Sequence, residues 1–541
     1  MKYKIITLLL FVFTVSSLSQ QKSNPKLVVG IVVDQMRYDY LEKFYDDFGE
    51  NGFKRLINGG TNFTNCKINY IPTVTGAGHA SIYTGTVPYF HGIVANNWKE
   101  RKTFENVNCV TAISTTNKMY VEGISKTLSP EQLFSTTIGD QIRLSNNGNS
   151  KVVSISIKDR GAILPAGQAA NAAYWYDDQN GKFITSFHYM KRLPQWMIDF
   201  NNSGIAKSYL NNKWNLYKSL KVYKDLPEDN SPYESDVFNE GKTSFPHTFK
   251  NLNDKQKYAK LSHTPWGNQI LVDLAKEVLK NENLGKGKYL DHLAISFSSP
   301  DKIGHDYGVL SYEVKDTYLR LDDQIAELLS MLDEQVGKGN YILFLTADHG
   351  GMENTSRLKN MYFNTGVLES TNYYDNLVGF LSEKYRSDSL IAARFSRNLY
   401  LNYNVIKKLK LDPAEVEATI KDYLLNNIPS ITEVFTRNEL EEMTASRNTN
   451  NYILNGFNNK RSGDILFSLK TNYLNYEKKY GTQHGSRHSY DNHIPLIFYG
   501  KSIPKSVRNE EVFIEDIAAT VCDLISVTQP SDCIGIPLLK K

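Results

Sequence analysis

Cysteine is scarce in this sequence, which limits the kinds of metal site and cross-link it can form. The 541 residues include only Cys66, Cys109, Cys522 and Cys533, and their spacing matches no cysteine-based zinc site. In an oxidising compartment, proximity along the chain favours pairing Cys66 with Cys109 and Cys522 with Cys533. Buried free thiols are the alternative.

Long apolar runs, repeats and strong net charge are also lacking. After the N-terminal segment, no stretch is both long enough and free enough of charge to span a membrane. The formal net charge is only +4, which gives no reason to expect nucleic acid as a partner. With 41% hydrophobic residues, the composition indicates a globular protein with a large core, and we expect a monomer.

Residues 1–19 have the pattern of a secretory signal peptide. Lys2 and Lys4 precede an apolar run, which is followed by small residues up to Ser19. This pattern predicts cleavage near Ser19 and a periplasmic or secreted mature protein spanning residues 20–541. Loss of the two lysines lowers the formal charge to +2.

Five runs of aliphatic and β-branched residues predict strands. They lie at 27–33, 152–157, 293–297, 341–345 and 494–499. The run 27–33 shows no polar alternation and the others are similarly apolar, so we expect strands buried on both faces of a mostly parallel sheet. Helical patterns separate several of them, the clearest being the apolar stripe from Val314 to Leu332, which Gly337 ends. The sequence therefore predicts an α/β fold with flanking helices.

Two long stretches, 161–261 and 352–480, interrupt this alternation. The second carries helices of its own, one of which begins at Asp412 and Pro413. We interpret both stretches as insertions that cap the ligand-binding edge of the sheet. The alternative is that they thicken the fold or form a second domain.

Polar residues follow four of the predicted strands. In strand order they are Asp34, then Lys158 and Arg160, then Asp301 and His305, then Asp348 and His349. Each residue alone could be a turn former or a structural histidine. The carboxyl ends of parallel strands share one edge, where α/β folds bind ligands. The coincidence across four strands therefore favours a functional site.

The sequence G-T-Q-H-G-S adds His484 to these candidates. Three carboxylates and three imidazoles suit zinc, although another divalent ion would also accept them. Two ions about 3.5 to 4 Å apart can clamp the attacking and leaving oxygens of a displacement at phosphorus. Four other histidines compete as ligands, namely His188, His292, His488 and His493.

The stretch I-P-T-V-T-G-A-G-H-A-S-I-Y-T-G, from Ile71 to Gly85, predicts a turn followed by a helix. Thr75 lies at the helix start, where unpaired backbone N–H groups and the helix dipole favour an anion such as phosphate. On these residues alone, Thr75 is either a capping residue or a nucleophile. Thr73 is its nearest competitor.

As an ordered set, the motifs resemble the alkaline phosphatase superfamily, most closely its flavobacterial PafA-type phosphatases. They are V-V-D-Q-M at 32–36, P-T-V-T-G-A-G-H at 72–79, H-G-I-V-A-N-N-W at 91–98, S-I-K-D-R at 156–160, D-K-I-G-H at 301–305, T-A-D-H-G at 346–350 and G-T-Q-H-G-S at 481–486. The match extends from about Leu27 to D-I-A-A-T-V at 516–521. Any single motif would be weak, but the ordered set is specific.

The resemblance implies a role for each matching residue. The implied ligands are Asp34, Asp348, His349 and the Thr75 oxygen for one zinc, and Asp301, His305 and His484 for a second. Thr75 would attack phosphorus, and water would hydrolyse the resulting phosphothreonine. Asn96, Lys158 and Arg160 would surround the remaining phosphoryl oxygens.

The resemblance also implies an alkaline phosphatase that acts on many small phosphate monoesters. Lys158 and Arg160 favour a monoester, because a diester places an organic group where the dianion offers oxygens. A phosphodiesterase or nucleotide pyrophosphatase on the same scaffold is the alternative, and a metal-stabilised binding protein is a third possibility. The sequence lacks D-S-A-A and the C-x-P-x-R or S-x-P-x-R signature, so a serine nucleophile, a third magnesium site and sulfatase activity are not implied.

Overall fold

The computed structural model describes residues 24–113, 121–369, 372–445, 447, 449–476 and 478–540. The signal-peptide prediction for residues 1–19 lies outside these ranges. Within them, no helix combines the length and apolar character needed to cross a membrane.

Four parallel strands form the centre of an eleven-stranded sheet in the described chain. Across the sheet they are β6 (Val152–Ser156), β9 (Asp291–Phe297), β1 (Leu27–Val33) and β10 (Tyr341–Thr346). Every residue of the four strands is buried. Both faces are therefore covered, which agrees with the mainly apolar sequences of these strands.

Further strands extend the sheet on both sides. On one side are β17 (His493–Gly500), β2 (Thr61–Lys67), β18 (Ser506–Arg508) and β19 (Val512–Phe513), and on the other are β7 (Ala172–Asp177), β8 (Lys182–Ser186) and β5 (Ile124–Ser125). The strand predicted at 494–499 is present as β17, but it runs antiparallel to β10.

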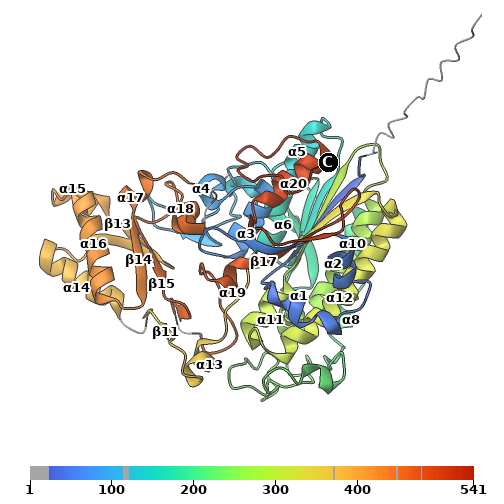
Figure 1. Cartoon of the computed structure of the whole chain (residues 1–541), viewed down its shortest axis with the longest axis horizontal. Coiled ribbons are helices and arrows are strands. Elements are labelled where there is room, and N and C mark those ends of the chain that lie inside the picture. Colours follow the sequence, from blue (N-terminus) through green and yellow to red (C-terminus); the bar gives the residue numbers. More distant parts are fainter. Residues whose placement is uncertain are drawn as a thin grey trace, which may run out of the picture.

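Helices cover both faces of the sheet (Figure 1). One face carries α3 (Thr75–Thr84), α5 (Ile138–Ser145), α6 (Asp159–Ala166) and α20 (Asp516–Ile525), and the other carries α2 (Phe53–Gly59), α10 (Trp266–Asn281) and α12 (Tyr312–Leu332). The predicted stripe from Val314 to Leu332 is the buried side of α12. Gly337 follows that helix with φ +100° and allows the chain to turn into β10.

Shorter elements connect these layers. They are α1 (Asp39–Lys43), α4 (Pro88–His91), β3 (Asn97–Lys99), β4 (Asn106–Asn108), α7 (Gln195–Asn202), α8 (Ile205–Tyr209), α9 (Asp254–Leu261), α11 (Ser299–Tyr307), α13 (Thr355–Asn360), α18 (Tyr452–Gly456) and α19 (Ser489–Asn492).

Residues 161–261, which we expected to form an insertion, belong in part to the main body. They continue α6, and they supply β7 and β8 to the central sheet. Further along this stretch, Trp214 packs against Phe245 and Tyr307, the last residue of α11. Residue 161 therefore does not mark the start of an insertion.

Residues 352–480 contain a second, smaller domain. Its antiparallel sheet consists of β12 (Ile391–Phe395), β13 (Asn398–Leu401), β15 (Ile465–Leu469) and β14 (Ile431–Thr436). The helices of this domain are α14 (Tyr373–Tyr385), α15 (Tyr403–Lys408), α16 (Pro413–Asn427) and α17 (Arg437–Glu441), and the short pair β11 (Gly366–Val367) and β16 (Tyr473–Leu474) lies beside it. A separate hydrophobic core holds it together. The domain projects from the main body (Figure 1).

The four cysteines are free thiols, so the favoured pairing is wrong. Cys66 packs in the main core, whereas Cys109 belongs to a different apolar cluster. Cys533 lies against Gly85, where an added Cβ would come within 2.5 Å of its Sγ. Burial raises the pKa of Cys109 and of Cys522 to about 12, so both stay protonated at neutral pH.

Candidate active site

The polar residues that follow the four parallel strands meet at one edge of the sheet. Asp34 follows β1 and Asp301 lies in α11 after β9, and both are buried. Lys158, which precedes α6, places its Nζ 2.7 Å from Asp34 Oδ2 and 2.6 Å from Asp301 Oδ2. Asp348 and His349 follow β10 and are fully buried. The structure therefore brings together residues that are up to 315 positions apart in the sequence.

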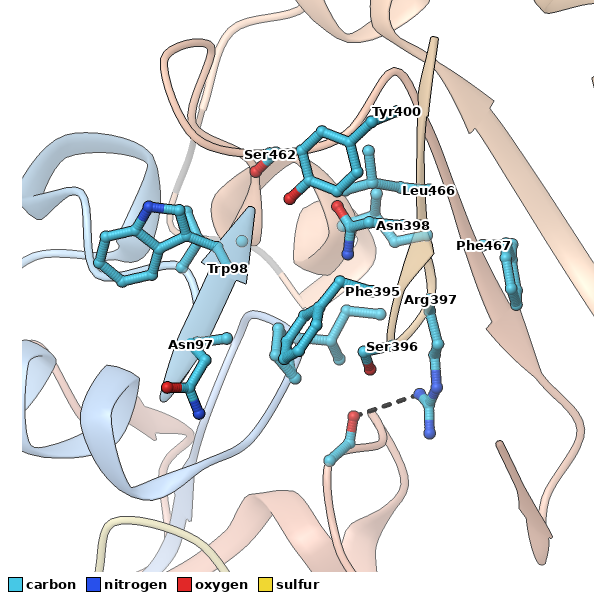
Figure 2. Close-up of a pocket in the computed structure, with 17 residues that line it drawn as sticks. Asn97, Trp98, Phe395, Ser396, Arg397, Asn398, Tyr400, Ser462, Leu466 and Phe467 are labelled. Atoms are coloured by element: carbon cyan, nitrogen blue, oxygen red, sulfur yellow. Dashed lines mark hydrogen bonds between the residues drawn. The ribbon is translucent and has the colours of Figure 1, made fainter. Parts of the chain in front are cut away.

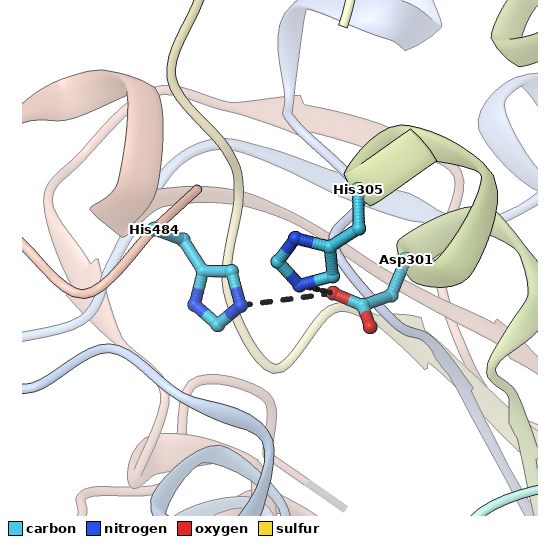
Figure 3. A group of neighbouring side chains, drawn as sticks. All are labelled: Asp301, His305 and His484. Carbon is cyan, nitrogen blue, oxygen red and sulfur yellow. Dashed lines mark ion pairs between the residues drawn. The ribbon is translucent and has the colours of Figure 1, made fainter. Parts of the chain in front are cut away.

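Asp301, His305 and His484 form one group that could hold a metal ion (Figure 3). His305 Nε2 lies 3.2 Å from Asp301 Oδ1, and His484 Nε2 lies 3.7 Å from the same oxygen. The Nδ1 atoms of the two rings lie 2.8 Å from the carbonyl oxygens of Thr482 and Thr73. A carbonyl only accepts, so Nδ1 carries the hydrogen and Nε2 is left for a metal.

Asp34, Asp301 and His349 form a second such group. His349 Nε2 is 3.5 Å from Asp34 Oδ1 and 3.7 Å from Asp348 Oδ2. Asp348 lies beside this group, with its Oδ2 3.3 Å from His79 Nδ1. Asp34, Asp348 and His349, which we expected to hold one zinc, are thus neighbours. The most compact group, however, contains Asp301 in place of Asp348.

The polar atoms of these groups fit a bound cation. Asp34 Oδ1, Asp348 Oδ2 and His349 Nε2 are buried, and none has a hydrogen-bond partner in the described structure. Unpartnered buried polar atoms are costly, and a cation among them would supply the missing interaction. Carboxylate oxygens and imidazole nitrogens without thiolates are donors that zinc accepts.

The crowding of carboxylates is visible in their pKa values. Burial, together with the charges of Asp301 and Asp348, raises the pKa of Asp34 to about 7. Although burial opposes it, the neighbouring His305 and Lys158 hold the pKa of Asp301 well below its usual range. The neighbouring carboxylates therefore disfavour the ionised form of Asp34. Bound cations would relieve this repulsion.

Thr75 is the first residue of α3, and Val74 occupies the cap position. The Thr75 side chain is almost fully buried, and its Oγ1 lies 3.3 Å from Lys158 Nζ. The hydroxyl of Thr73, by contrast, donates to the Ser486 carbonyl at 3.0 Å. Of the two candidate threonines, only Thr75 directs its hydroxyl toward the carboxylate cluster.

Asn96 lies beside the start of α3, and Arg160 lies two residues after Lys158. Asn96 Oδ1 accepts a hydrogen bond from Gly76 N at 2.7 Å, which leaves its NH₂ group free of that contact. Arg160 Nε is buried without a partner in the described residues. The nearest carboxylate to its guanidinium is Asp159, with Oδ1 3.5 Å from Nη1. Both side chains thus retain donors that a phosphate could use.

Sequence reasoning missed two residues that position this cluster. Gln35 donates from Nε2 to Asp301 Oδ1 at 2.8 Å and from its backbone N to Asp348 Oδ1 at 3.2 Å. Its φ of 65° is unusual for a residue other than glycine. His79 contacts Ser296 Oγ at 2.8 Å. Gln35 adjoins Asp34 and His79 is one helical turn from Thr75, so both signals were present in the motifs.

The competing histidines lie away from the cluster. His188, His292 and His493 each contact a backbone carbonyl, at 2.8, 3.1 and 2.8 Å respectively. His488 lies 3.5 Å from Thr471 Oγ1. Only His484 of the candidates near the C-terminus contributes to a donor group.

Comparisons with known proteins agree with this arrangement. Residues 28–491 match the family model of type I phosphodiesterases and nucleotide pyrophosphatases. The chain is 39% identical to alkaline phosphatase PhoV of Synechococcus elongatus, over 99% of this chain and 98% of PhoV. It is 38% identical to alkaline phosphatase PafA of Elizabethkingia meningoseptica, over 98% of each. The chain belongs to the alkaline phosphatase superfamily.

Solved structures of this superfamily confirm the predicted fold. The crystal structure of wild-type PafA superposes with a TM-score of 0.88 at 37% identity, covering 95% of this chain and 98% of PafA. A PafA variant superposes with a TM-score of 0.89. In that variant a threonine is replaced by serine, and an asparagine, a lysine and an arginine are replaced by alanine.

Proposed function

We propose that this protein is a metal-dependent alkaline phosphatase that hydrolyses small phosphate monoesters with Thr75 as the nucleophile. The observation that carries the proposal is the pair of donor groups sharing Asp301 beside a buried threonine hydroxyl at a helix start. The similarity to PhoV and PafA, both named alkaline phosphatases, supports it over nearly the full chain.

We propose two zinc ions as the cofactors. The residues that would hold them are Asp34, Asp348 and His349 for one ion, and Asp301, His305 and His484 for the other. When bound, zinc lowers the pKa of a coordinated hydroxyl and stabilises negative charge on oxygen.

The chain's own residues account for the remaining steps. Thr75 Oγ1 gives up its proton and forms a bond to phosphorus, while the bond from phosphorus to the ester oxygen breaks and the organic part leaves as an alcohol that takes up a proton. Water then attacks the phosphothreonine, the bond from phosphorus to Oγ1 breaks, and phosphate leaves while a proton from the water returns to Thr75. Lys158, now bridging Asp34 and Asp301, would turn its ammonium to the phosphoryl oxygens once cations neutralise those carboxylates.

Asn96 and Arg160 would complete the phosphate contacts. The residues replaced in the PafA variant are separated by 21, 62 and 2 positions. Thr75, Asn96, Lys158 and Arg160 have the same separations and the same residue types. This agreement supports treating the four residues as one phosphate-binding set.

A second candidate function is phosphodiester hydrolysis, which the description of the matching family model favours. Turnover of p-nitrophenyl phosphate and of its methyl diester by the zinc-loaded protein separates the two. We expect the monoester to be the better substrate. A preference for the diester, together with little effect of Lys158→Ala, would favour the phosphodiesterase instead.

The role of Thr75 is tested by Thr75→Ala, with Thr73→Ala as the matched control. We expect the first variant to lose at least about 10³-fold in kcat while it keeps its zinc, since the nucleophile is gone. Thr73→Ala should lose far less, because its hydroxyl binds a backbone carbonyl. Full turnover by Thr75→Ala would exclude Thr75 as the nucleophile, whereas a zinc-loaded wild type without turnover would favour a binding protein.

We also propose that the protein is exported, with cleavage near Ser19, and acts as a monomer. The N-terminal pattern supports export. N-terminal sequencing of the protein from the periplasm or the medium, followed by light scattering, tests both statements. A purified protein that begins at Met1 would contradict export with cleavage, and a light-scattering mass equal to that of a dimer would contradict the monomer.

A further inference from the structure

A cavity of about 550 Å³ opens beside the metal-binding residues. His305, His484 and Asn96 line its inner end. Its outer wall comes from the smaller domain, at the turn between β12 and β13, and from Leu474, Asn475, Tyr476 and Lys478. Since the phosphoryl group would bind at the inner end, the organic part of a substrate would face this outer wall.

The turn between β12 and β13 is held in a fixed position at this wall. Ser396 has φ 54°, a left-handed conformation that few residues other than glycine adopt. Asn475 Nδ2 donates to Ser396 Oγ at 3.1 Å, and Asn475 Oδ1 accepts from Arg397 Nε at 3.1 Å. Arg397 Nη1 also donates to the Gly485 carbonyl at 3.2 Å (dashed in Figure 2). Two hydrogen bonds therefore hold Arg397 next to the loop that carries His484.

Arg397 has no carboxylate within ion-pair distance in the described chain. Its two bonds go to neutral oxygens, and a guanidinium has five N–H donors. Asp491 is the acid whose charge acts most strongly on Arg397. Its Oδ2 already accepts hydrogen bonds from Ser486 N and Oγ. Glu369 lines the same cavity but forms no ion pair with Arg397. The guanidinium can therefore still bind an anion.

Lys478 provides a second cation on this wall. Its Nζ lies 3.2 Å from His305 Nδ1. That nitrogen carries a hydrogen which it donates to the Thr482 carbonyl, so it cannot accept from the ammonium. Lys478 is also without a carboxylate at ion-pair distance in the described residues. The rings of Phe395 and Tyr476 also line the cavity and offer apolar surface.

We propose that this cavity is the leaving-group site, and that Arg397 and Lys478 select phosphate monoesters whose organic part carries a second negative charge. The inference rests on the proposed phosphatase function. The expected ligands are esters with a carboxylate or a further phosphate on the organic part, since both anions match a guanidinium and an ammonium.

The test compares phenyl phosphate with its meta- and para-carboxyphenyl analogues on the zinc-loaded protein. The readout is the ratio of kcat/KM for a carboxylated ester to that for phenyl phosphate, because a general loss of activity cancels in this ratio. We expect Arg397→Gln and Lys478→Gln each to lower the ratio about tenfold, as expected for one charge-assisted hydrogen bond. Arg397→Lys, which keeps the charge, should lower it less.

Arg394→Gln and Lys479→Gln are matched controls. Arg394 is an exposed residue of β12 that lies over the Tyr374 ring, and Lys479 is the neighbour of Lys478. Each control removes one positive charge outside the cavity lining, so the ratio should not change. Ratios unchanged in both Arg397→Gln and Lys478→Gln would overturn the inference. A wild-type protein that hydrolyses none of the three esters would instead refute the proposed function.

Discussion

Lys158 contacts both the carboxylate cluster and the hydroxyl of Thr75. Its ammonium is within 2.7 Å of Asp34 and Asp301 and 3.3 Å from the Thr75 oxygen. Although burial opposes it, these two carboxylates raise the pKa of Lys158. The side chain is therefore charged at the point where a phosphoryl oxygen would approach Thr75.

Replacing Lys158 should affect monoesters more than diesters. We expect Lys158→Ala to lose about 10- to 100-fold in kcat/KM for p-nitrophenyl phosphate, the value of one charge-assisted contact. The methyl diester, measured on the same variant, should lose less because it offers one fewer charged oxygen. Equal losses on the two substrates would exclude a specific contact with the dianion.

Gln35 contacts one of the proposed metal ligands. Its side-chain amide donates to Asp301, the carboxylate common to both donor groups. We expect Gln35→Asn to weaken zinc affinity about 10- to 100-fold, because asparagine tolerates φ 65° but is too short to reach Asp301. Competition with a chelator measures the affinity. Gln168→Asn, at an amide that binds Pro130 O, is the control, and an effect of equal size there would contradict this role.

At the scale of elements, the site depends on how closely α3 approaches the loop after β10. Gly78 of α3 faces that loop, and an added Cβ would lie 2.4 Å from the Asp348 carbonyl oxygen. Since backbone on both sides would have to move, a side chain at this position would separate Thr75 from Asp348.

Gly78→Ala should therefore destabilise the protein. We expect a loss of about 1–3 kcal/mol in unfolding free energy, together with a lower kcat. Gly379→Ala in α14 is the matched control, since nothing lies within 4 Å of its added Cβ. That variant should gain up to about 1 kcal/mol from the higher helix propensity of alanine. Thermal unfolding measures both, and a Gly78→Ala midpoint at or above wild type would contradict the close approach.

A buried acidic pair links α12 to the long connection between α8 and α9. Burial and the neighbouring Glu313 raise the pKa of Glu234 to about 10, and burial holds the pKa of Glu313 well above its usual range. The folded state thus keeps a proton on Glu234 that the unfolded chain releases near its usual pKa of 4.5. Stability from this group is present below pH 4.5 and is lost as the pH rises toward 10.

Glu234→Gln should remove that pH dependence. Between pH 5 and 9 the wild-type unfolding free energy should fall relative to the variant, by at most about 1.4 kcal/mol per pH unit. Thermal midpoints of both proteins across this range provide the measurement. Curves that stay parallel from pH 5 to 9 would show that Glu234 does not titrate in this way.

At the scale of the whole molecule, the donor groups connect segments that are otherwise far apart. Asp34 follows β1, Asp301 and His305 belong to α11, His349 follows β10, and His484 precedes α19. Bound cations would hold these segments together, and their loss would leave carboxylates unneutralised in a buried site.

Chelation should therefore lower both activity and stability. A metal present at about 1,000 times its Kd stabilises the folded state by about 4 kcal/mol. We expect chelator treatment to abolish turnover and to lower the thermal midpoint, and zinc to restore both. Retention of the original midpoint without metal would show that the donor groups are not occupied in the purified protein.

Local sequence patterns predicted the parts of this fold that depend on local chemistry. The run 27–33 is β1 with the same bounds, and the stripe from Val314 to Leu332 is the buried side of α12. Strand direction was not readable in the same way, because β17 has the same aliphatic composition as a parallel strand but pairs antiparallel with β10. The failed cysteine pairing has a similar cause, since proximity along the chain does not place Cys66 and Cys109 in one core cluster.

The amino-acid sequence by itself determined which chemistry is available: carboxylates and imidazoles directly after buried strands, and a threonine at a helix start. Strand ends and helix starts are set by local hydrogen bonding and burial, so these features are readable residue by residue. Only the tertiary structure decided that Asp301 is common to both donor groups, that Gln35 and His79 orient them, and that Arg397 reaches the cavity from another domain. Those relations depend on the packing of distant segments, which local pattern does not encode.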